Sequence, residues 1–534
     1  MKKTSYGLIQ SCPDHQVSLA TTALTLTKAV LRNSGKQLPR IALAAVLLTS
    51  ACFFAAQAVA QNLPVLGDTG REDLSPMMER KLGEEIMLGI RNDKDYVDDD
   101  VSAEYLNEFG SRLLEVHQEA RGDANFDFYF FAVRDPTINA FALPGGFIGV
   151  HTQLVLTAQN ESQLASVLAH EIGHISQRHI ARMIGSQKKD MLIPIASMIL
   201  AALTMRSNPD AAAALVIGGE GVAMQRQLDF SQNAEREADR VGLQILRDGG
   251  YDPSDMVTFF ERMQSSTKAY SDNYPAFLRT HPMTTERIAD IQSRIRLETF
   301  KKHTDSPEFQ LYRARVRVLQ AESEQDLLNS KDYFEDQASK SASLKQTNPA
   351  AEYGLAFIAF KQNNFQQAQH QLDLAQKNTA ENSVFFAKLQ LDILLRTQQN
   401  SAALKLAESA INAFPISRSV SYQYADALVA NRQAEAAITY LRDQTQLYRK
   451  DFDLQEHLAK AYAAVGRETL QHLALAESYA LQGAISPALD QLGIARRSPD
   501  ATFYDHAMID ARERDWRERY KDDLEEMKKK GDKQ

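Results

Sequence analysis

Short apolar runs and one long helical pattern fill the first part of the chain. Ser75 followed by Pro76 is typical of a helix start, because serine caps the first turn and proline fits it. Runs rich in aromatic or β-branched residues then predict three strands, at 126–133, 137–144 and 147–156. Apolar positions recur at helical spacing over 162–183, which predicts a long helix. Short strands mixed with helices indicate an α+β domain.

Two apolar segments follow, at 191–205 and 211–223. Neither reaches the roughly 20 residues that a membrane-spanning helix needs. Pro194 and Gly218-Gly219 also interrupt them. One interpretation is two buried helices beside the long helix. The other is a hydrophobic helical hairpin exposed toward a membrane or a client protein, and the sequence leaves both open.

The pattern changes after about residue 305, where the chain becomes helical throughout and repeats itself. Equivalent positions recur every 34 residues in three ladders: Ala368, Ala402 and Ala436; Leu372, Leu406 and Tyr440; and Phe357, Leu391, Ala425 and Ala459. This period, with small residues in the second helix, is the tetratricopeptide signature, and a generic helical bundle would not produce it. Each unit is a helix pair that cannot bury its apolar face alone, so we expect a stacked superhelix whose concave face binds protein segments. The first unit, at 309–342, fits poorly, and the last lies near 468–496.

The N-terminal segment reads as a targeting signal rather than as part of the fold. Residues 41–60 are apolar and uncharged, follow Lys36 and Arg40, and end in the small-x-small sequence Ala58-Val59-Ala60. This pattern predicts a secretory signal peptide with a leader over residues 1–60. Two alternatives are a retained membrane anchor and a lipoprotein modified at Cys52, although threonine stands where a lipobox usually has leucine.

Composition and charge then narrow the class of protein. The 534 residues are 44% hydrophobic and 24% charged, which is ordinary globular composition and enough for two or more domains. The formal net charge is −9, and no basic domain is present, which argues against a nucleic-acid partner. Residues 1–60 hold six basic side chains, one acidic side chain and both cysteines, Cys12 and Cys52. The remaining chain has neither disulfides nor thiol chemistry, which fits a bacterial periplasm.

The predicted long helix carries the sequence HEIGH, which is His170-Glu171-Ile172-Gly173-His174. Residues four apart share one face of a helix, so both imidazoles can reach one metal ion. Glu171 can then contact a water on that ion. The pattern is short enough to arise by chance, and a catalytic zinc usually keeps a third protein ligand.

A third histidine placed as in metzincins is missing, because Ile180 occupies its position and His179 is one residue short. Further along, Glu235 and Asp239 are again four apart on a predicted helix, in NAEREADRVGLQIL (233–246). Glu235 can ligate a metal, and Asp239 can accept a hydrogen bond from a ligand histidine and fix its tautomer. Taken alone, EREAD also fits a solvated acidic helix face.

HEIGH followed by EREAD resembles the gluzincin peptidases typified by HtpX and the CAAX prenyl protease. Three further features strengthen the resemblance: Asn139-Ala140-Phe141-Ala142 with Gly145-Gly146, Glu161-Ser162-Gln163-Leu164-Ala165, and the HP-x4-R element with His281, Pro282 and Arg287. The chain lacks the multiple spans of those membrane enzymes. It resembles the exported branch that joins a peptidase domain to tetratricopeptide repeats, with the strongest resemblance over residues 75–295.

The resemblance implies one zinc ion per chain, held by His170, His174 and Glu235, with Glu171 as general base. It places Asp239 behind the ligands and Arg287 in the catalytic set. His281 is implied to lie close to the metal, where it either stabilises the oxyanion or fills the fourth zinc position and silences the enzyme. The sequence leaves both roles open, and our hypothesis is the second.

The predicted architecture is a mostly helical α+β zinc metallopeptidase domain followed by an all-α tetratricopeptide superhelix. The expected segments are a signal peptide and leader at 1–60, the peptidase at 61–300, the repeats at 305–500 and a charged helical tail at 501–534. The expected function is a periplasmic zinc endopeptidase that degrades misfolded or stalled outer-membrane proteins and assists their assembly. The expected partners are unfolded envelope proteins and the assembly machinery, with peripheral membrane contact through 191–223 as an open interpretation. The alternative is a repeat-based chaperone or scaffold with a largely dormant metal domain.

Overall fold

The computed structural model describes residues 74–185, 232–269, 276–296, 303–377, 379 and 382–531. The predicted signal peptide (1–60), the two apolar segments at 191–223 and the turn-rich segment 271–275 lie outside the described residues. Within the described part, every helix is too short or too polar to cross a membrane.

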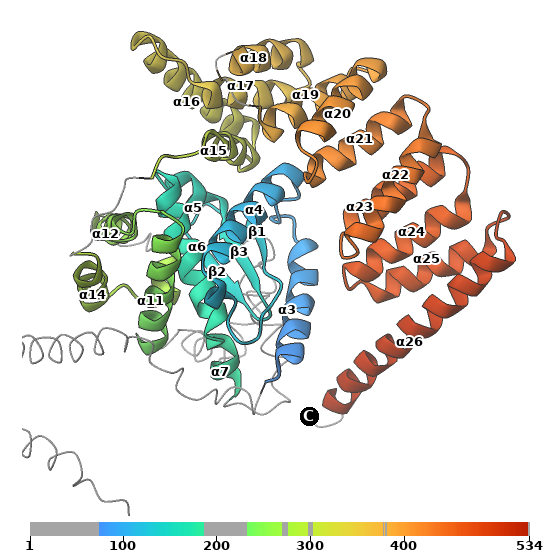
Figure 1. The fold of residues 1–534 in the computed structure, drawn as a ribbon, viewed down its shortest axis with the longest axis horizontal. Coiled ribbons are helices and arrows are strands. Elements are labelled where there is room, and N and C mark those ends of the chain that lie inside the picture. Colours follow the sequence, from blue (N-terminus) through green and yellow to red (C-terminus); the bar gives the residue numbers. More distant parts are fainter. Residues whose placement is uncertain are drawn as a thin grey trace, which may run out of the picture. The chain divides into compact units, whose positions relative to one another are not determined.

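A small mixed sheet forms the centre of the N-terminal half (Figure 1). Two helices and a 3-10 turn precede it: α3 (Pro76–Arg91), α4 (Asp100–Val116) and η2 (Gln118–Arg121). The strands are β1 (Tyr129–Val133), β2 (Ala140–Leu143) and β3 (Phe147–His151), in the order β1-β3-β2. β3 runs parallel to β1 and antiparallel to β2, so β2 is an edge strand.

The three predicted strands are confirmed, but the third is shorter than the predicted range 147–156. Strand β3 ends at His151, and the next residues form the short helix α5 (Thr152–Thr157). Leu154 and Val155 are both fully buried. Adjacent residues of a strand point to opposite faces, and a short apolar run does not by itself distinguish a strand from a helix.

The long helix predicted over 162–183 is wrong in one respect, because it is two helices. Helix α6 (Glu161–Ser176) ends before α7 (His179–Gly185), and Arg178 between them has a φ of 51°. The buried Arg178 side chain donates to Glu79 Oε2 at 3.1 Å and to the Leu74 carbonyl at 2.6 Å. These contacts with the first residues of the described chain hold the break, and no local sequence pattern predicts it.

Helix α11 (Gln232–Asp248) packs along α6 with almost no space between the two backbones. A Cβ atom on Gly173 would lie 2.9 Å from the Ala238 backbone, and one on Gly242 would lie 3.2 Å from the His170 nitrogen. The glycines therefore allow the close approach that brings Glu235 next to the HEIGH residues. Three helices complete this half: α12 (Ser254–Ala269), α13 (Ala276–Thr280) and α14 (Thr285–Ile295).

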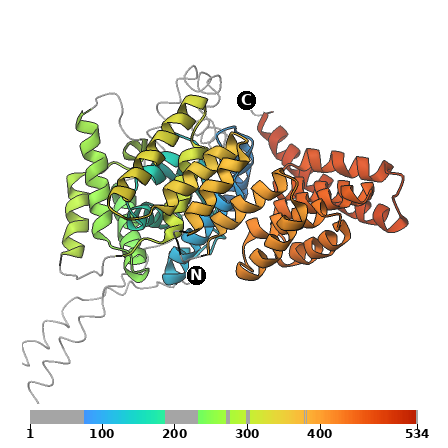
Figure 2. The same ribbon diagram turned by 90° about the horizontal axis from the view of Figure 1, so that it is seen from above.

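The C-terminal half is built of successive helices that lie side by side (Figures 1 and 2). They are α15 (Pro307–Leu319), α16 (Glu324–Ser343), α17 (Pro349–Lys361), α18 (Phe365–Lys377), α19 (Val384–Arg396), α20 (Asn400–Ala413), α21 (Arg418–Ala430), α22 (Ala434–Leu447), α23 (Phe452–Ala464), α24 (Glu468–Leu481), α25 (Ile485–Arg497) and α26 (Phe503–Gly531). The tail predicted at 501–534 is therefore helical over α26. Ile509 and Trp516 bury their side chains against the preceding helices, while much of the first half of α26 is exposed.

The repeat period needs a correction between the first two helix pairs. Helix α19 begins 35 residues after α17, whereas α21 and α23 each begin 34 residues after the preceding equivalent helix. The ladder through Ala402 and Ala436 therefore slips, and these two alanines are exposed while Ala403 and Ala437 are fully buried.

The other two ladders show the same slip. In the second, Ala407 and Leu441 are fully buried whereas Leu406 and Tyr440 are half-buried. In the third, Leu391, Ala425 and Ala459 are buried at a spacing of 34, but their equivalent on α17 is the fully buried Ala356, 35 residues before Leu391, rather than Phe357. The connection between α18 and α19 is longer than its later equivalents and adds the extra residue.

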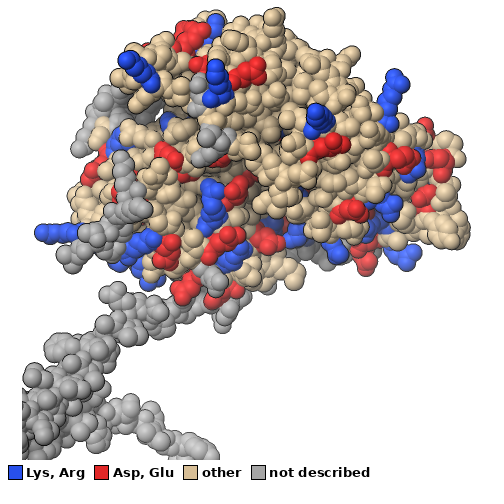
Figure 3. All heavy atoms as spheres, turned by 45° about the horizontal axis from the view of Figure 1, so that its top comes forward, with Lys and Arg blue, Asp and Glu red and all other residues tan. Residues whose placement is uncertain are grey.

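One buried apolar cluster joins the two halves of the described chain. It contains side chains of the sheet, of α6 and α11, and of every helix from α15 to α19. Arg315 on α15 also pairs with Asp99, the N-cap of α4, through two contacts of 2.8 and 2.6 Å. On the face seen in Figure 3, acidic and basic side chains are interspersed. The predicted boundary at 300–305 thus falls between segments that share a core.

Candidate metal centre

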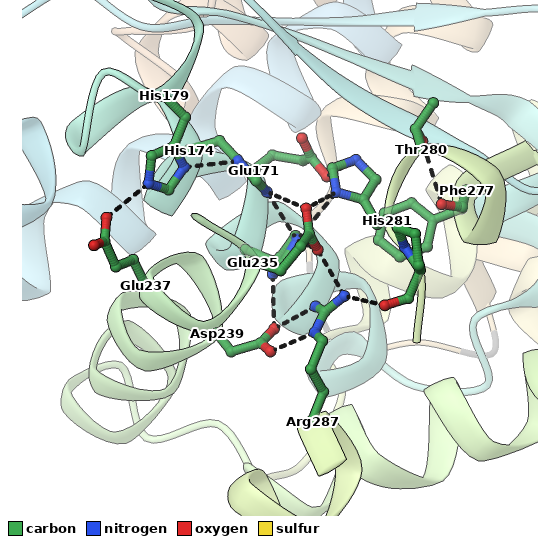
Figure 4. Close-up of polar contacts among 12 residues, drawn as sticks. Glu171, His174, His179, Glu235, Glu237, Asp239, Phe277, Thr280, His281 and Arg287 are labelled. Carbon is green, nitrogen blue, oxygen red and sulfur yellow. Dashed lines mark hydrogen bonds and ion pairs between the residues drawn. The ribbon is translucent and has the colours of Figure 1, made fainter. Parts of the chain in front are cut away.

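Four buried elements bring their polar side chains to one point (Figure 4). Helix α6 contributes the HEIGH residues, and α11 contributes Glu235 and Asp239. His281 follows the last residue of α13, and Arg287 lies in the first turn of α14. All seven predicted site residues are at most 3% exposed: His170, Glu171, His174, Glu235, Asp239, His281 and Arg287.

Four of these residues place one ligand atom each in a compact cluster: His170, His174, Glu235 and His281. His170 Nε2 lies 3.1 Å from His174 Nε2 and 3.4 Å from His281 Nδ1. Glu235 Oε1 lies 3.0 Å from His281 Nδ1 and 3.4 Å from His174 Nε2. Ligand atoms about 2.0–2.1 Å from a tetrahedral zinc ion would be about 3.3 Å apart. The observed spacing therefore fits one ion of that size.

Partners on the far side of each helical imidazole fix its orientation. His170 Nδ1 lies 3.0 Å from Asp239 Oδ1, and His174 Nδ1 lies 2.9 Å from His179 Nδ1. These contacts leave the two Nε2 atoms facing each other at 3.1 Å. A metal ion bound by both Nε2 lone pairs would fit this arrangement, with Asp239 and His179 on the far side of the two rings.

His179 and Glu237 form an outer pair that the sequence reasoning missed. His179 Nε2 lies 3.0 Å from Glu237 Oε2, and Arg182 donates to the same oxygen at 2.6 Å. The signal was present, because His179 stands five residues after His174 and Glu237 lies inside EREAD. The sequence suggests His179 only as a possible metal ligand, whereas in the structure it contacts the far side of the ligand His174.

Arg287 lies against the two carboxylates of α11. It donates to Asp239 at 2.8 and 2.7 Å, and its Nη1 lies 2.6 Å from Glu235 Oε2 and 3.0 Å from the Pro282 carbonyl. These contacts orient Glu235 and tie it to the segment that carries His281. They describe a positioning residue, whereas the predicted membership of the catalytic set stays a prediction.

Glu171 stands beside the cluster without contributing to it. Both of its carboxylate oxygens are buried and lack a well-formed hydrogen bond, although the Ala142 backbone in β2 is close enough to lower its pKa slightly. The nearest imidazole atom in an ion-pair arrangement is His281 Nε2, 3.6 Å from Glu171 Oε1. Burial raises the pKa of Glu171 above its ordinary value, and the neighbouring histidines offset this only in part. Such a carboxylate is suited to accepting a proton.

The acidic and basic groups of the cluster stabilise one another. Burial alone would lower the pKa of His170, but hydrogen bonds with Asp239 and Glu235 outweigh it and raise this pKa to about 9. Burial alone would raise the pKa of Glu235, but His281 and His170 hold it well below its usual range. Buried charges are tolerated when they are paired or bind a metal, and this arrangement does the first and fits the second.

Replacing Gly173 with alanine is expected to weaken metal binding and to destabilise the fold. The added Cβ would lie 2.9 Å from Ala238 Cα and O, so α11 must move. Overpacking of this kind costs about 1–3 kcal/mol. That exceeds the gain of up to about 1 kcal/mol from replacing glycine with alanine in a helix. Thermal unfolding and a competitive chelator titration measure both effects.

Gly493→Ala in α25 is the matched control for this change. Its Cβ would meet only Arg497 Nη1, at an ordinary 3.6 Å. This variant is expected to keep full metal affinity and to gain stability. Unchanged metal affinity in Gly173→Ala would mean that the close approach of α6 and α11 does not set the position of Glu235.

Comparisons with known proteins agree with this geometry. The model of Peptidase family M48 matches residues 102–295, which include the whole cluster. The Beta-barrel assembly-enhancing protease of Yersinia pestis is 30% identical over 455 residues, covering 84% of this chain and 90% of that protein. The mitochondrial metalloendopeptidase OMA1 of Schizosaccharomyces pombe is 29% identical over 219 residues, covering 38% of this chain and 62% of that protein.

A solved structure, described as YrrB, a TPR protein with an unusual peptide-binding site, covers 35% of this chain and 91% of its own at 14% identity. Its TM-score is 0.26, which is too low to support a conclusion. The similarity to the Yersinia protein, by contrast, extends over both halves of the chain. The chain is a metallopeptidase and belongs to peptidase family M48.

Proposed function

We propose that this chain is a zinc endopeptidase of the bacterial periplasm that cleaves misfolded or stalled outer-membrane proteins and assists their assembly. The observation that carries the proposal is the spacing of the four ligand atoms beside a buried glutamate without a well-formed hydrogen bond. The name of the Yersinia relative and the predicted signal over residues 1–60 support the compartment and the client class. The helix pairs from α17 onward are proposed to recruit clients or the assembly machinery.

The chemistry follows from the positions of the side chains. Zinc bound by His170, His174 and Glu235 would polarise the attacking water and the scissile carbonyl. Glu171 takes the proton of that water and passes it to the leaving amine. Asp239 and His179 keep the two helical imidazoles in the tautomer that presents Nε2.

Strand β2 is suited to holding the substrate in line with these groups. It is the edge strand of the sheet and packs against α6. The outer edge of an edge strand can pair with an extended peptide through main-chain hydrogen bonds, which select little by sequence. Low sequence selectivity fits a peptidase whose clients share a misfolded state rather than a motif.

His281 is proposed to hold the enzyme latent by filling the fourth position of the metal. Its Nδ1 lies 3.4 Å from His170 Nε2 and 3.0 Å from Glu235 Oε1, and its Nε2 faces Glu171 at 3.6 Å. The imidazole thus stands between Glu171 and the cluster, where the attacking water is needed. The segment that carries His281 is also tied to the sheet, because the backbone N–H of Phe277 on α13 donates to the Ile138 carbonyl just ahead of β2 at 3.1 Å.

Replacing His281 with alanine is expected to raise the cleavage of an unfolded outer-membrane protein by the zinc-loaded chain. Removing the imidazole opens the fourth position to water, and three protein ligands still hold the metal. His472→Ala on α24 is the control, because that histidine bonds Gln491 within the repeats. If His281 instead stabilises the oxyanion, the variant loses about 10²–10³-fold in rate with its zinc retained, which would contradict the latent state.

A second candidate is a chaperone or scaffold whose metal centre stays dormant. The closed four-residue cluster is the observation that favours it, since structural zinc sites are closed and catalytic sites keep an open position. Cells that lack the natural protein and carry Glu171→Gln separate the two candidates. Full rescue of outer-membrane protein assembly by this variant favours the scaffold, and loss of rescue favours the peptidase.

A further inference from the structure

Three arginines alternate along helix α15 in the sequence Arg313-Ala314-Arg315-Val316-Arg317. Residues four apart share one face of a helix, so Arg313 and Arg317 project together and Arg315 projects away from them. Arg315 has a clear structural role, because it pairs with both oxygens of Asp99 and donates to the Tyr353 hydroxyl at 2.8 Å. Within the described residues, neither Arg313 nor Arg317 forms an ion pair with a carboxylate.

The two guanidinium groups are held in place by contacts other than ion pairs. Arg313 donates to Gln310 Oε1 at 3.3 Å and to the Leu156 carbonyl at 3.2 Å, while its buried Nε finds no acceptor in the described chain. Arg317 stacks on the Tyr333 ring, with its central carbon 3.8 Å from the ring centre. Burial lowers the pKa of Arg313, and Arg317 beside it lowers it further, while Tyr333 and Asp305 offset this only in part. A partly buried cation that forms no ion pair is costly, which is unusual for a side chain with only a structural role.

Both arginines line a cavity of about 150 Å³ between α5 and the helices α15, α16 and α17. A single water needs only about 10–15 Å³, so the cavity has room for a small group and several waters. Its polar lining comprises Gln310, Arg313, Arg317, Tyr333, Gln337 and Asn348. Two guanidinium forks with amide and phenol donors around them match a planar carboxylate, which accepts several hydrogen bonds at once.

The surroundings of the cavity indicate what carries that carboxylate. A second pocket of about 260 Å³ shares Gln310, Asn348 and Ala350 with it, and a third of about 440 Å³ shares Thr379, Ser383 and Phe386 with the second. The three pockets are therefore neighbours in a row from α5 to α20, and this row is called the groove below. Beyond the arginines the lining is mostly amides and apolar side chains, the groups that bind peptide backbone and apolar residues, with one carboxylate, Glu308, in the second pocket. The amides are Gln376, Asn382 and Gln390, and the apolar side chains include Leu311, Phe386 and Phe414.

We propose that Arg313 and Arg317 bind the terminal carboxylate of a polypeptide whose last residues lie along this groove. The site is separate from the metal cluster and belongs to a seam that peptidase and repeat elements build together. The inference extends the proposed recruiting role of the helix pairs, because it states which end of a client they hold. A chain with a free C-terminus would be bound there regardless of its internal sequence.

The test measures peptide binding by the full-length Glu171→Gln protein, which prevents cleavage during the measurement. The probe is a fluorescein-labelled decapeptide pool of mixed sequence, made with either a free C-terminal carboxylate or a C-terminal amide. The free acid is expected to bind about 10-fold or more tightly, since a hydrogen bond to a charged group is worth about that factor. Arg313→Gln and Arg317→Gln are each expected to lose this preference, and Arg442→Gln, an exposed arginine on α22, is expected to keep it.

Equal affinity for the acid and the amide, or no binding of either at millimolar concentration, would overturn the site. An amidated peptide with internal Asp and Glu that competes as well as the free acid would overturn the terminal assignment. Inorganic phosphate competing better than acetate would overturn the carboxylate. Arg317→Lys keeps the charge without the fork, so it reports on the site if a glutamine variant fails to fold. Casein cleavage by the unmodified chain tests the peptidase separately.

Discussion

Replacing Glu171 with glutamine is expected to lower the rate of peptide cleavage by about 10²–10⁴-fold and to leave the bound metal in place. Glutamine has nearly the shape of glutamate but cannot take the proton of the attacking water. None of the ligand atoms belongs to Glu171, so the metal is not expected to leave. Initial rates on an unfolded outer-membrane protein, together with metal content per chain, measure the two halves of the prediction.

Glu335→Gln is the matched control for this substitution. Glu335 is an exposed residue on α16 whose nearest ion-pair partner is Lys331 at 3.5 Å. Its replacement is expected to change neither the rate nor the metal content. Full activity of Glu171→Gln, or loss of its metal, would show that Glu171 has been given the wrong role.

Replacing His174 with alanine is expected to remove the tightly bound metal and to abolish cleavage. The substitution leaves His170, Glu235 and His281 in the cluster. His174 is expected to matter more than His281, because α6 and His179 hold its imidazole in place. The metal stabilises the folded state by mass action, about 4 kcal/mol when its free concentration is 1,000 times the dissociation constant. The variant should therefore unfold at a lower temperature, and added chelator should no longer change that temperature.

His179→Ala separates the loss of a ligand from the loss of its support. His179 contacts His174 Nδ1 at 2.9 Å and supplies no ligand atom. Removing such an outer partner typically lowers metal affinity or activity about 10–100-fold, so this variant should still bind metal at saturating concentration. A full equivalent of tightly bound metal in His174→Ala would remove this residue from the ligand set.

Local spacing was enough to predict the helical parts of the site. His170 and His174 share a face because they are four apart, and so do Glu235 and Asp239 on α11. His281 and Arg287 have no such spacing, and only the family resemblance drew attention to them. Their positions depend on how α13 and α14 fold back over α6 and α11, which is a long-range property that no short window contains.

The errors in the fold have the same origin. The break between α6 and α7 depends on a buried ion pair between Arg178 and Glu79, which lie 99 residues apart in the chain. The slip in the repeat ladders comes from one additional residue between α17 and α19. A search with a fixed period of 34 does not reveal the additional residue. In the structure this residue shifts the buried position of α20 from Ala402 to Ala403.

The buried cluster that runs from the sheet to α19 has a consequence for the order in which the chain folds. A chain that leaves an export channel N-terminus first presents the HEIGH helix early, but side chains as late as Ile393 are still needed to close its core. While they are missing, apolar faces of α4 and α5 stay wet and the fold gains little stability. A partly exported chain would therefore lack a fully packed metal centre, and peptidase activity would appear only once the helices up to α19 have folded onto the N-terminal half.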